Sequence, residues 1–282
     1  MRINHNISSM VTQGSLYRIN QNTNKTLEKL STGLRINRAS DDAAGLSVSE
    51  QLRTQVNGLN MAKRNAQDGI ALLQVAEGAA NETSDMLQRM RELAVQSAND
   101  TLTSTERGYI NQEYLALQSE IDRVTESTQY NTQQLINDTG TAGRFGVAGN
   151  QTLQVGANDS TNDVITIDID GIDTASMGVD SVSSNLSTQS DANAAITLLD
   201  TAIDSVNNMR SDLGAYVNRL EHTVNNLINQ EYNTQSAESL IRDADFAKET
   251  SEFTKHQILQ QSASSMLVQS NMKAQSVLSL LG

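Results

Sequence analysis

The sequence contains no cysteine, no proline and no tryptophan, and aromatic residues make up only 3% of its 282 residues. Without cysteine the chain can form neither a disulfide framework nor a thiolate metal site or nucleophile. Without proline it lacks the residue that breaks helices most strongly, so nothing of that kind limits helix length. The few aromatic residues and a hydrophobic share of 37% favour long, thin helical packing over a thick globular core.

Basic residues and long apolar runs are also scarce. The formal net charge is −13, which disfavours nucleic-acid binding, because nucleic-acid-binding proteins neutralise phosphates with a basic surface. No run approaches the roughly 20 apolar residues of a membrane span, so we expect no membrane insertion. The start MRINHNISSM lacks the apolar core of a secretory signal. If the protein leaves the cell, we expect another export route.

A helical stripe of small and apolar residues dominates the first half of the chain. Its members recur at steps of mostly three and four, which is the spacing of one helix face. They are Leu52, Val56, Leu59, Ala66, Ile70, Leu73, Ala76, Ala80, Thr83, Leu87, Met90 and Ala94. A continuous helix to about Gln96 would be roughly 65 to 70 Å long, so it needs a packing partner along its length.

Further stripes repeat this period. The segment NDTLTSTER interrupts the first one, and Thr103 followed by Glu106 fits a capping box that begins a new helix. The later stripes are Ile110, Tyr114, Leu117, Ile121 and Val124, then Ile196, Leu199, Ile203, Val206, Leu213, Val217, Leu220, Val224 and Leu227. Arg210 alone interrupts the stripe that runs from Ile196 to Leu227. Alternating steps of four and three are a heptad signature, so we predict a mainly α fold, a long coiled-coil-like helical bundle rod.

The middle of the chain has a different composition. Residues 138–190 hold seven of the sixteen glycines and neither Lys nor Glu. The hydrophobic period changes to two, as in a strand, at Phe145, Val147, Leu153, Val155, Ile165, Ile167 and Ile169. Gly149-Asn150 and Asn158-Asp159 have the composition of turns. We therefore predict a small β-hairpin insertion that lies on the helices.

The segment STGLRINRASDDAAGL, residues 31–46, is interpreted as a joint between two helices. Gly33 and Gly45 punctuate the helical pattern, and Asp41 and Asp42 fit the cap of the following helix. The alternative, a pair of catalytic carboxylates, is disfavoured because adjacent helix positions do not face each other. Arg35 and Arg38 beside acidic helices predict contacts between subunits.

The two ends of the chain, residues 1–40 and 245–282, carry weaker apolar stripes. Such stripes lack a sufficient core of their own and are expected to become ordered against neighbouring molecules. They consist of Ile3, Ile7, Met10, Leu27, Leu30 and Leu34 at one end, and of Leu259, Ala263, Met266, Val277, Leu280 and Leu281 at the other.

No catalytic, metal-binding or cofactor motif is present in the sequence. His5, His222 and His256 are far apart and none lies in a metal-ligand spacing. Phosphate-binding loops and the nucleophile elbow are likewise missing. The sequence therefore predicts no catalytic residue, no metal ligand and no cofactor.

Long runs of the sequence closely resemble bacterial flagellin. The resemblance is carried by the runs EKLSTGLRINRASDDAAGLSVSEQLRTQVNGLNMAKRNAQDGIALLQVAEGAANE (28–82), LQRMRELAVQSAN (87–99), EIDRVTESTQYN (120–131), RSDLGAYVNRLEHTVNN (210–226), AESLIRDADFAKETSEFTKHQIL (237–259) and SVLSLLG (276–282). It implies a structural subunit that self-assembles into the helical filament used for motility. It also implies a terminal helical layer (1–43 with 245–282) lining an inner tube, an outer helical bundle layer (44–137 with 191–244) and a short variable region (138–190).

The resemblance further implies where the protein works and what it meets. A flagellin is secreted uncleaved through the flagellar export apparatus into an extracellular filament. Its partners would be other copies of itself, filament cap and hook-associated proteins, and an export chaperone on the C-terminal segment that holds Leu259, Met266, Leu280 and Leu281. The positions that match the family's contacts with the Toll-like flagellin receptor are Arg89, Leu93 and Glu113, of which Arg89 and Leu93 are one helical turn apart.

Other interpretations remain beside this one. A hook–filament junction protein has similar ends but a far lower copy number. A spirochaete flagellin would form a periplasmic filament core. A flagellin with an embedded metallopeptidase would need an HExxH motif between residues 138 and 190, where no His occurs. A monomeric coiled-coil adhesin or secreted effector would not form filaments.

Overall fold

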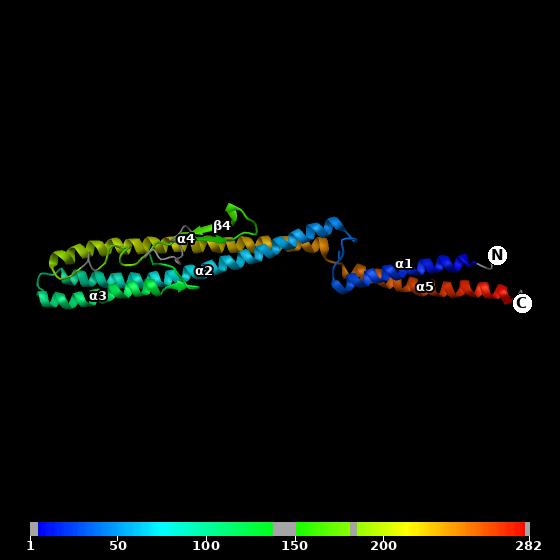
Figure 1. Cartoon of the computed structure of the whole chain (residues 1–282), viewed down its shortest axis with the longest axis horizontal. Coiled ribbons are helices and arrows are strands. Elements are labelled where there is room, and N and C mark those ends of the chain that lie inside the picture. Colours follow the sequence, from blue (N-terminus) through cyan, green and yellow to red (C-terminus); the bar gives the residue numbers. More distant parts are fainter. Residues whose placement is uncertain (1–4, 138–150, 181–184, 280–282) are drawn as a thin grey trace. The chain divides into compact units, whose positions relative to one another are not determined.

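The computed structural model describes residues 5–137, 151–180 and 185–279 (Figure 1). Its α-helices are α1 (Ile7–Thr32), α2 (Ala43–Ser97), α3 (Ser104–Ser127), α4 (Gln189–Arg242) and α5 (Phe246–Ser279). Its strands are β1 (Gln129–Tyr130), β2 (Gln133–Gln134), β3 (Gln151–Gln154) and β4 (Val164–Ile167), with a 3₁₀-helix at Thr161–Asp163. The strands pair as two antiparallel two-stranded sheets, β1 with β2 and β3 with β4. The predicted mainly α fold with a small β insertion is confirmed.

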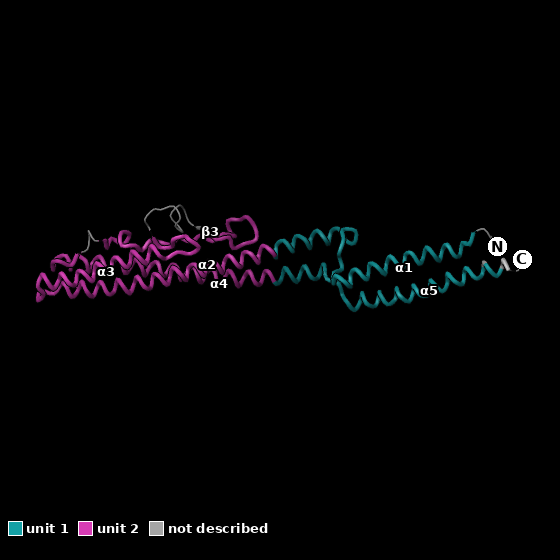
Figure 2. The backbone as a smooth tube through the Cα atoms, turned by 60° about the horizontal axis from the view of Figure 1, so that its bottom comes forward, with its two compact units in different colours: residues 1–56, 232–282 teal, residues 57–231 magenta. Residues whose placement is uncertain are grey.

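The chain folds as two compact units (Figure 2). Unit 1 comprises residues 1–56 and 232–282, and unit 2 comprises residues 57–231. Unit 1 contains α1, α5 and the adjoining ends of α2 and α4. Unit 2 contains the rest of α2 and α4, all of α3 and the strands.

In unit 2, α3 runs beside α2 and α4 (Figure 1). The predicted stripes form the contact, since every member of the stripes on α3 and on this part of α4 is buried or half-buried. At the interruption predicted for Arg210, the neighbouring Met209 enters the core and is 3% exposed. The capping box is also confirmed: the Thr103 backbone N–H donates to Glu106 Oε2 at 2.8 Å, and the Glu106 N–H donates to Thr103 Oγ1 at 3.4 Å. Local sequence thus fixes where α3 begins.

The β insertion differs in part from the prediction. Strand β3 pairs with β4, with Leu153 opposite Ile165. Asn158-Asp159 lies in the connection between them, which spans residues 155–163 and includes the 3₁₀-helix. Phe145, Val147 and Gly149-Asn150 lie outside the described residues. The pair β1–β2 was not predicted; its turn uses the positive φ angles of Asn131 and Thr132, as two-residue hairpin loops require.

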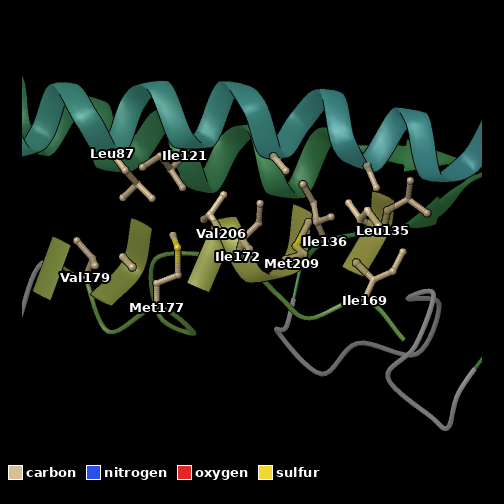
Figure 3. Packing of buried hydrophobic residues seen from close by; sticks show 14 of the residues in the cluster. Leu87, Ile121, Leu135, Ile136, Ile169, Ile172, Met177, Val179, Val206 and Met209 are labelled. Carbon is tan, nitrogen blue, oxygen red and sulfur yellow. The ribbon is translucent and has the colours of Figure 1, made fainter. Parts of the chain in front are cut away.

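Residues 164–180 and 185–188, here called the strap, cover the helices of unit 2 as predicted for the insertion. The strap contributes the buried side chains Ile165, Ile167, Ile169, Ile172, Met177, Val179 and Leu186 to the core. Figure 3 shows Ile169, Ile172, Met177 and Val179 in one layer with Leu87, Ile121 and Val206 from the helices. Because isolated hairpins are marginal in water, this shared core is what holds the insertion in place.

Helix side chains bond mainly to the backbone of the strap. Gln118 Nε2 donates to the Val179 carbonyl at 2.7 Å, Asn111 Oδ1 accepts from the Leu186 N–H at 3.0 Å, Asp122 Oδ1 accepts from the Thr174 N–H at 3.1 Å, and Ser97 Oγ donates to the Leu186 carbonyl at 2.9 Å. These bonds satisfy peptide groups in a stretch that otherwise has little regular secondary structure.

Candidate assembly surface

In unit 1, α1 and α5 pack against each other as an antiparallel pair. Asn6 Nδ2 donates to the Ser270 carbonyl at 3.1 Å at one end, and Lys29 Nζ lies 3.5 Å from Glu249 Oε1 at the other. Thr26 is the single fully buried side chain of α1, and no described side chain of α5 is fully buried. The contact between these two helices is therefore thin, because nearly all of its side chains stay exposed or only partly buried.

The large hydrophobic side chains of unit 1 are mostly left outside this contact. Of the twenty large hydrophobic residues exposed in the described chain, fourteen belong to unit 1. They are Ile7, Met10, Val11, Tyr17, Leu27, Val48, Tyr232, Leu240, Phe246, Ile258, Leu259, Met266, Val268 and Met272. Of the 34 buried hydrophobic residues described, only Ile36 and Val56 belong to unit 1. A surface this apolar, in a unit with so small a core, is typical of a protein–protein interaction site.

One shallow groove lies on the outer face of α5. It has a volume of about 730 Å³ and is lined by Phe246, Ala247, Thr250, Ser251, Thr254, Lys255 and Ile258. Phe246 and Ile258 are exposed by 58% and 59%. Apolar side chains and the hydroxyl groups of Thr250, Ser251 and Thr254 therefore line the groove together.

The joint predicted at residues 31–46 is a pair of connections that run side by side. Helix α1 ends at Gly33, whose φ of 71° is the left-handed conformation that glycine adopts most readily. The Ala244 N–H donates to the Gly33 carbonyl at 2.9 Å, and the Arg35 N–H donates to the Arg242 carbonyl at 2.7 Å. The connection from α1 to α2 is therefore hydrogen-bonded to the connection from α4 to α5.

The two arginines of the joint bind within their own chain. Arg35 Nε and Nη2 donate to the Ile241 carbonyl at 3.1 and 2.5 Å, where the C-terminal end of α4 attracts a cation. Arg38 Nε pairs with Glu28 Oε1 at 3.0 Å while its side chain stays 70% exposed. The expected contacts of these arginines with neighbouring subunits stay predictions.

The adjacent aspartates of the joint cap backbone N–H groups. Asp42 Oδ1 accepts from the Gly45 N–H at 2.9 Å and so caps α2, as predicted. Asp41 Oδ2 accepts from the Arg38 N–H at 3.1 Å and the Asn37 N–H at 3.3 Å. Their carboxylates hold different backbone groups, which favours the capping interpretation over a catalytic pair.

The cap on the other side of the joint was not predicted from the sequence. Asp245 Oδ1 accepts from the Ala247 and Lys248 N–H groups at 2.9 and 3.2 Å, at the start of α5. An aspartate directly before a helical run was the available signal. It was overlooked because the weak stripe of the last segment did not mark where the helix begins.

The three positions that match the receptor contacts lie in unit 2 and differ in exposure. Arg89 Nη2 pairs with Glu113 Oε1 at 2.8 Å and Arg89 Nη1 with Glu92 Oε2 at 2.9 Å, all three being about half exposed or more. The hydrogen bonds that Arg89 donates to Glu113 raise the pKa of Arg89, and the hydrogen bond that it donates to Glu92 adds to the effect. Leu93, in contrast, is 2% exposed and belongs to the core. The structure brings Arg89 and Glu113 together on the surface and keeps Leu93 beneath it.

The C-terminal segment is exposed where it is described. Leu259 and Met266 are exposed by 41% and 64%, while Leu280 and Leu281 lie outside the described residues.

Within the described ranges no group of three or more His, Cys, Asp or Glu is arranged to hold a metal ion. Over the same ranges, none of the helices combines the length and hydropathy of a membrane span.

Comparison with known proteins gives a consistent result over both ends of the chain. Residues 3–141 match the family described as the bacterial flagellin N-terminal helical region, and residues 196–281 match the bacterial flagellin C-terminal helical region. The chain is 45% identical to the flagellin of Halalkalibacterium halodurans over 282 residues and 46% identical to the flagellar filament 33 kDa core protein of Treponema phagedenis over 292 residues, with 100% of both chains covered in each case. The crystal structure of Bacillus cereus flagellin matches with a TM-score of 0.50 at 34% identity, covering 58% of this chain and 88% of that one.

Proposed function

The chain belongs to the bacterial flagellin family, and on this premise we propose that unit 1 is the part that joins one subunit to the next. As a flagellin, the chain is a structural subunit of the flagellar filament, which serves motility, and not an enzyme. It is secreted and its filament is extracellular, or periplasmic if the source is a spirochaete. The proposal concerns which of its surfaces makes the polymer.

The observation that carries the proposal is the uneven distribution of hydrophobic residues. Unit 1 exposes fourteen large hydrophobic side chains and buries two hydrophobic ones, whereas unit 2 exposes six and buries 32. Burial of a fully exposed large side chain contributes about 1.5–3 kcal/mol. A neighbouring subunit that covers unit 1 therefore buries much apolar surface, whereas unit 2 has already buried most of its apolar surface by folding.

We assign the two layers of the filament accordingly. Residues 1–43 with 245–282 form the inner tube, residues 44–137 with 191–244 the outer helical layer, and residues 138–190 the short variable region. The terminal segments are loosely packed before assembly and become fully packed against their neighbours, as coupled folding and binding predicts. The thin contact between α1 and α5 supports this order of events.

Further partners follow from the same surfaces. The export apparatus passes the subunit to the growing tip, where cap and hook-associated proteins meet it, and a C-terminal export chaperone covers the apolar segment around Leu259 and Met266 until then. If the Toll-like flagellin receptor recognises this chain, direct contacts come from Arg89 and Glu113, and Leu93 acts by supporting α2 from beneath.

Deletion of residues 1–40 or of residues 245–282 tests the proposal. We expect each product to remain a soluble helical protein that does not polymerise when seeded, because unit 2 keeps its core and the joining surface is lost. Circular dichroism reports the helices and negative-stain electron microscopy the filaments. Normal filaments from either deletion would contradict the proposal.

A pair of matched substitutions separates the role of unit 1 from a general effect of lost hydrophobic surface. Met10 in unit 1 and Met61 in unit 2 are exposed by 64% and 53%. We expect Met10→Ser to raise the concentration needed for polymerisation and Met61→Ser to leave it nearly unchanged. Equal effects of both would show that unit 1 has no special part in assembly.

A further inference from the structure

Some helical glycines in this chain mark places where another segment comes very close to a helix. A Cβ atom added at Gly58 would lie 2.8 Å from Ala157 Cβ, and one added at Gly69 would lie 2.3 Å from Leu153 Cδ1. Both contacts bring the β3–β4 hairpin and its loop against α2. Because glycine is among the weakest helix formers, its use inside α2 has a clear reason at these positions.

Four helical glycines of the described chain have no such reason within their own chain. A Cβ atom added at Gly14, Gly78, Gly108 or Gly214 would meet no atom within 4 Å. They differ in the residues three and four positions away, which lie on the same helix face. Gly78, Gly108 and Gly214 each have at most one large hydrophobic residue there.

Gly14 is surrounded by exposed hydrophobic side chains. Met10, Val11 and Tyr17 occupy three of its four neighbouring positions on the face of α1 and are exposed by 64%, 63% and 66%. Arg18 occupies the fourth position and lies 3.5 Å from Ser15 Oγ. Gly14 therefore leaves an open gap, here called the notch, in an apolar surface. Arg18 is the one charged residue beside it.

The surroundings of this notch carry almost no charge. The sequence from His5 to Tyr17 has no Asp, Glu, Lys or Arg, and neither has the sequence from Gln257 to Met272 on α5. These two stretches are paired, since Ser9 Oγ donates to Asn271 Oδ1 at 3.0 Å. Burial of this end of the helix pair thus removes no Asp, Glu, Lys or Arg side chain of these two stretches from water, and burying an unpaired charge is very costly.

We infer that Gly14 is the point at which a helix of a second copy of this chain crosses α1 at close range. The inference rests on the proposed function, which supplies the second copy as the occupant. Without a side chain at the crossing point, two helix backbones can approach closely. Met10, Val11 and Tyr17 then pack around the crossing and exclude water.

The test is Gly14→Ala in the full-length chain. No atom of the chain obstructs an added methyl group at this position, and alanine favours the helix, so the helix content of the monomer should stay the same or rise. In the polymer the methyl group would overpack the crossing, and we expect the critical concentration for seeded polymerisation to rise about tenfold or more. Sedimentation of polymer over a range of protein concentrations measures it.

Two controls isolate the contact. Gly78→Ala makes the same change in a helix with equally open surroundings but with Glu77 and Glu82 nearby, and Gln13→Ala changes an exposed neighbour of Gly14. Both should polymerise like the unchanged chain. If Gly78→Ala raises the critical concentration as much as Gly14→Ala does, the effect comes from helix propensity and the inference is wrong.

A normal critical concentration for Gly14→Ala would also overturn the inference. The proposed function is judged separately by the terminal deletions and by Met10→Ser. A defect in those variants beside a normal Gly14→Ala would reject the crossing point and keep unit 1 as the joining surface. Normal assembly of the deletions would reject the proposed function itself.

Discussion

Substitution of Gly45 by alanine tests how tightly the joint is built. Gly45 lies in the first turn of α2, and a Cβ atom added there would lie 2.5 Å from Asp42 Oδ2 and 2.8 Å from Ile36 Cδ1. Ile36 is 2% exposed, and Asp42 caps the helix through the Gly45 N–H at 2.9 Å. The methyl group cannot enter unless both side chains turn away.

The cost of Gly45→Ala follows from what those two side chains lose. Loss of a helix cap costs about 1 kcal/mol, and overpacking at a buried site such as Ile36 costs about 1–3 kcal/mol. The higher helix propensity of alanine offsets up to about 1 kcal/mol of this. With the full offset we expect the joint to be destabilised by about 1–3 kcal/mol, which corresponds to roughly a 5- to 150-fold increase in local opening.

Hydrogen exchange measures this opening at individual amides. The amides at residues 45 and 46 are the reporters, because both donate to Asp42 in the structure, one to its carboxylate and one to its carbonyl. The control is Gly78→Ala in the same helix, where no atom lies within 4 Å of the added carbon and exchange nearby should slow slightly. If residues 45 and 46 exchange no faster in Gly45→Ala than in the unchanged chain, the close contacts do not hold the joint.

Two further predictions concern unit 2. Leu93→Ala should lower the free energy of unfolding by about 2–5 kcal/mol because it opens a cavity in the core, whereas Arg89→Ala should change the melting temperature little; equal melting temperatures for the two variants would contradict the burial of Leu93. The pKa of Glu106 is lowered chiefly by the Thr103 backbone N–H and then by the Thr103 hydroxyl. The capping box should therefore stabilise the start of α3 fully above the ordinary glutamate pKa of about 4.3 and lose that effect as the pH falls through the lowered pKa, seen as faster acid exchange of the first α3 amides. In Glu106→Gln this loss should disappear, and its persistence would show that another group is responsible.

The features that local sequence determines could be predicted before the structure. The capping box at Thr103 and Glu106 depends on two side chains three residues apart, and the end of α1 depends on the conformational freedom of Gly33. The stripes of α3 and α4 depend on a helical period that packing preserves. Each of these signals lies within one continuous segment, so it can be recognised without knowing which distant segments pack against it.

Other features depend on contacts between distant segments and could not be predicted. The stripe traced along α2 included Met90 and Ala94 but passed over Leu93, because a single stripe assumes one packing partner. In unit 2, α2 lies between two helices: Arg89 pairs with Glu113 on α3, and Arg91 Nε pairs with Asp200 Oδ1 on α4 at 2.6 Å. A helix between two neighbours buries a wider face, and Leu93 lies on the added part of it.

The side chain of Arg35 shows the same limit at the joint. Its place beside acidic helices predicted a contact with another subunit, which stays a prediction. Its hydrogen-bond partner within the chain, a carbonyl more than two hundred residues away, was not predicted. No pattern in the sequence marks a main-chain acceptor, since every residue has one. The fold of the connections therefore had to be known before this partner could be named.

The strap of unit 2 has a consequence for how this protein can change. The hydrogen bonds from the helices to the strap go mainly to its peptide groups, which are the same whatever side chains the strap carries. The strap residues that face the helices must still fill the core, but the residues that face away contribute little to holding the strap in its position. Substitutions of the outward side chains should therefore leave the helices beneath the strap unchanged.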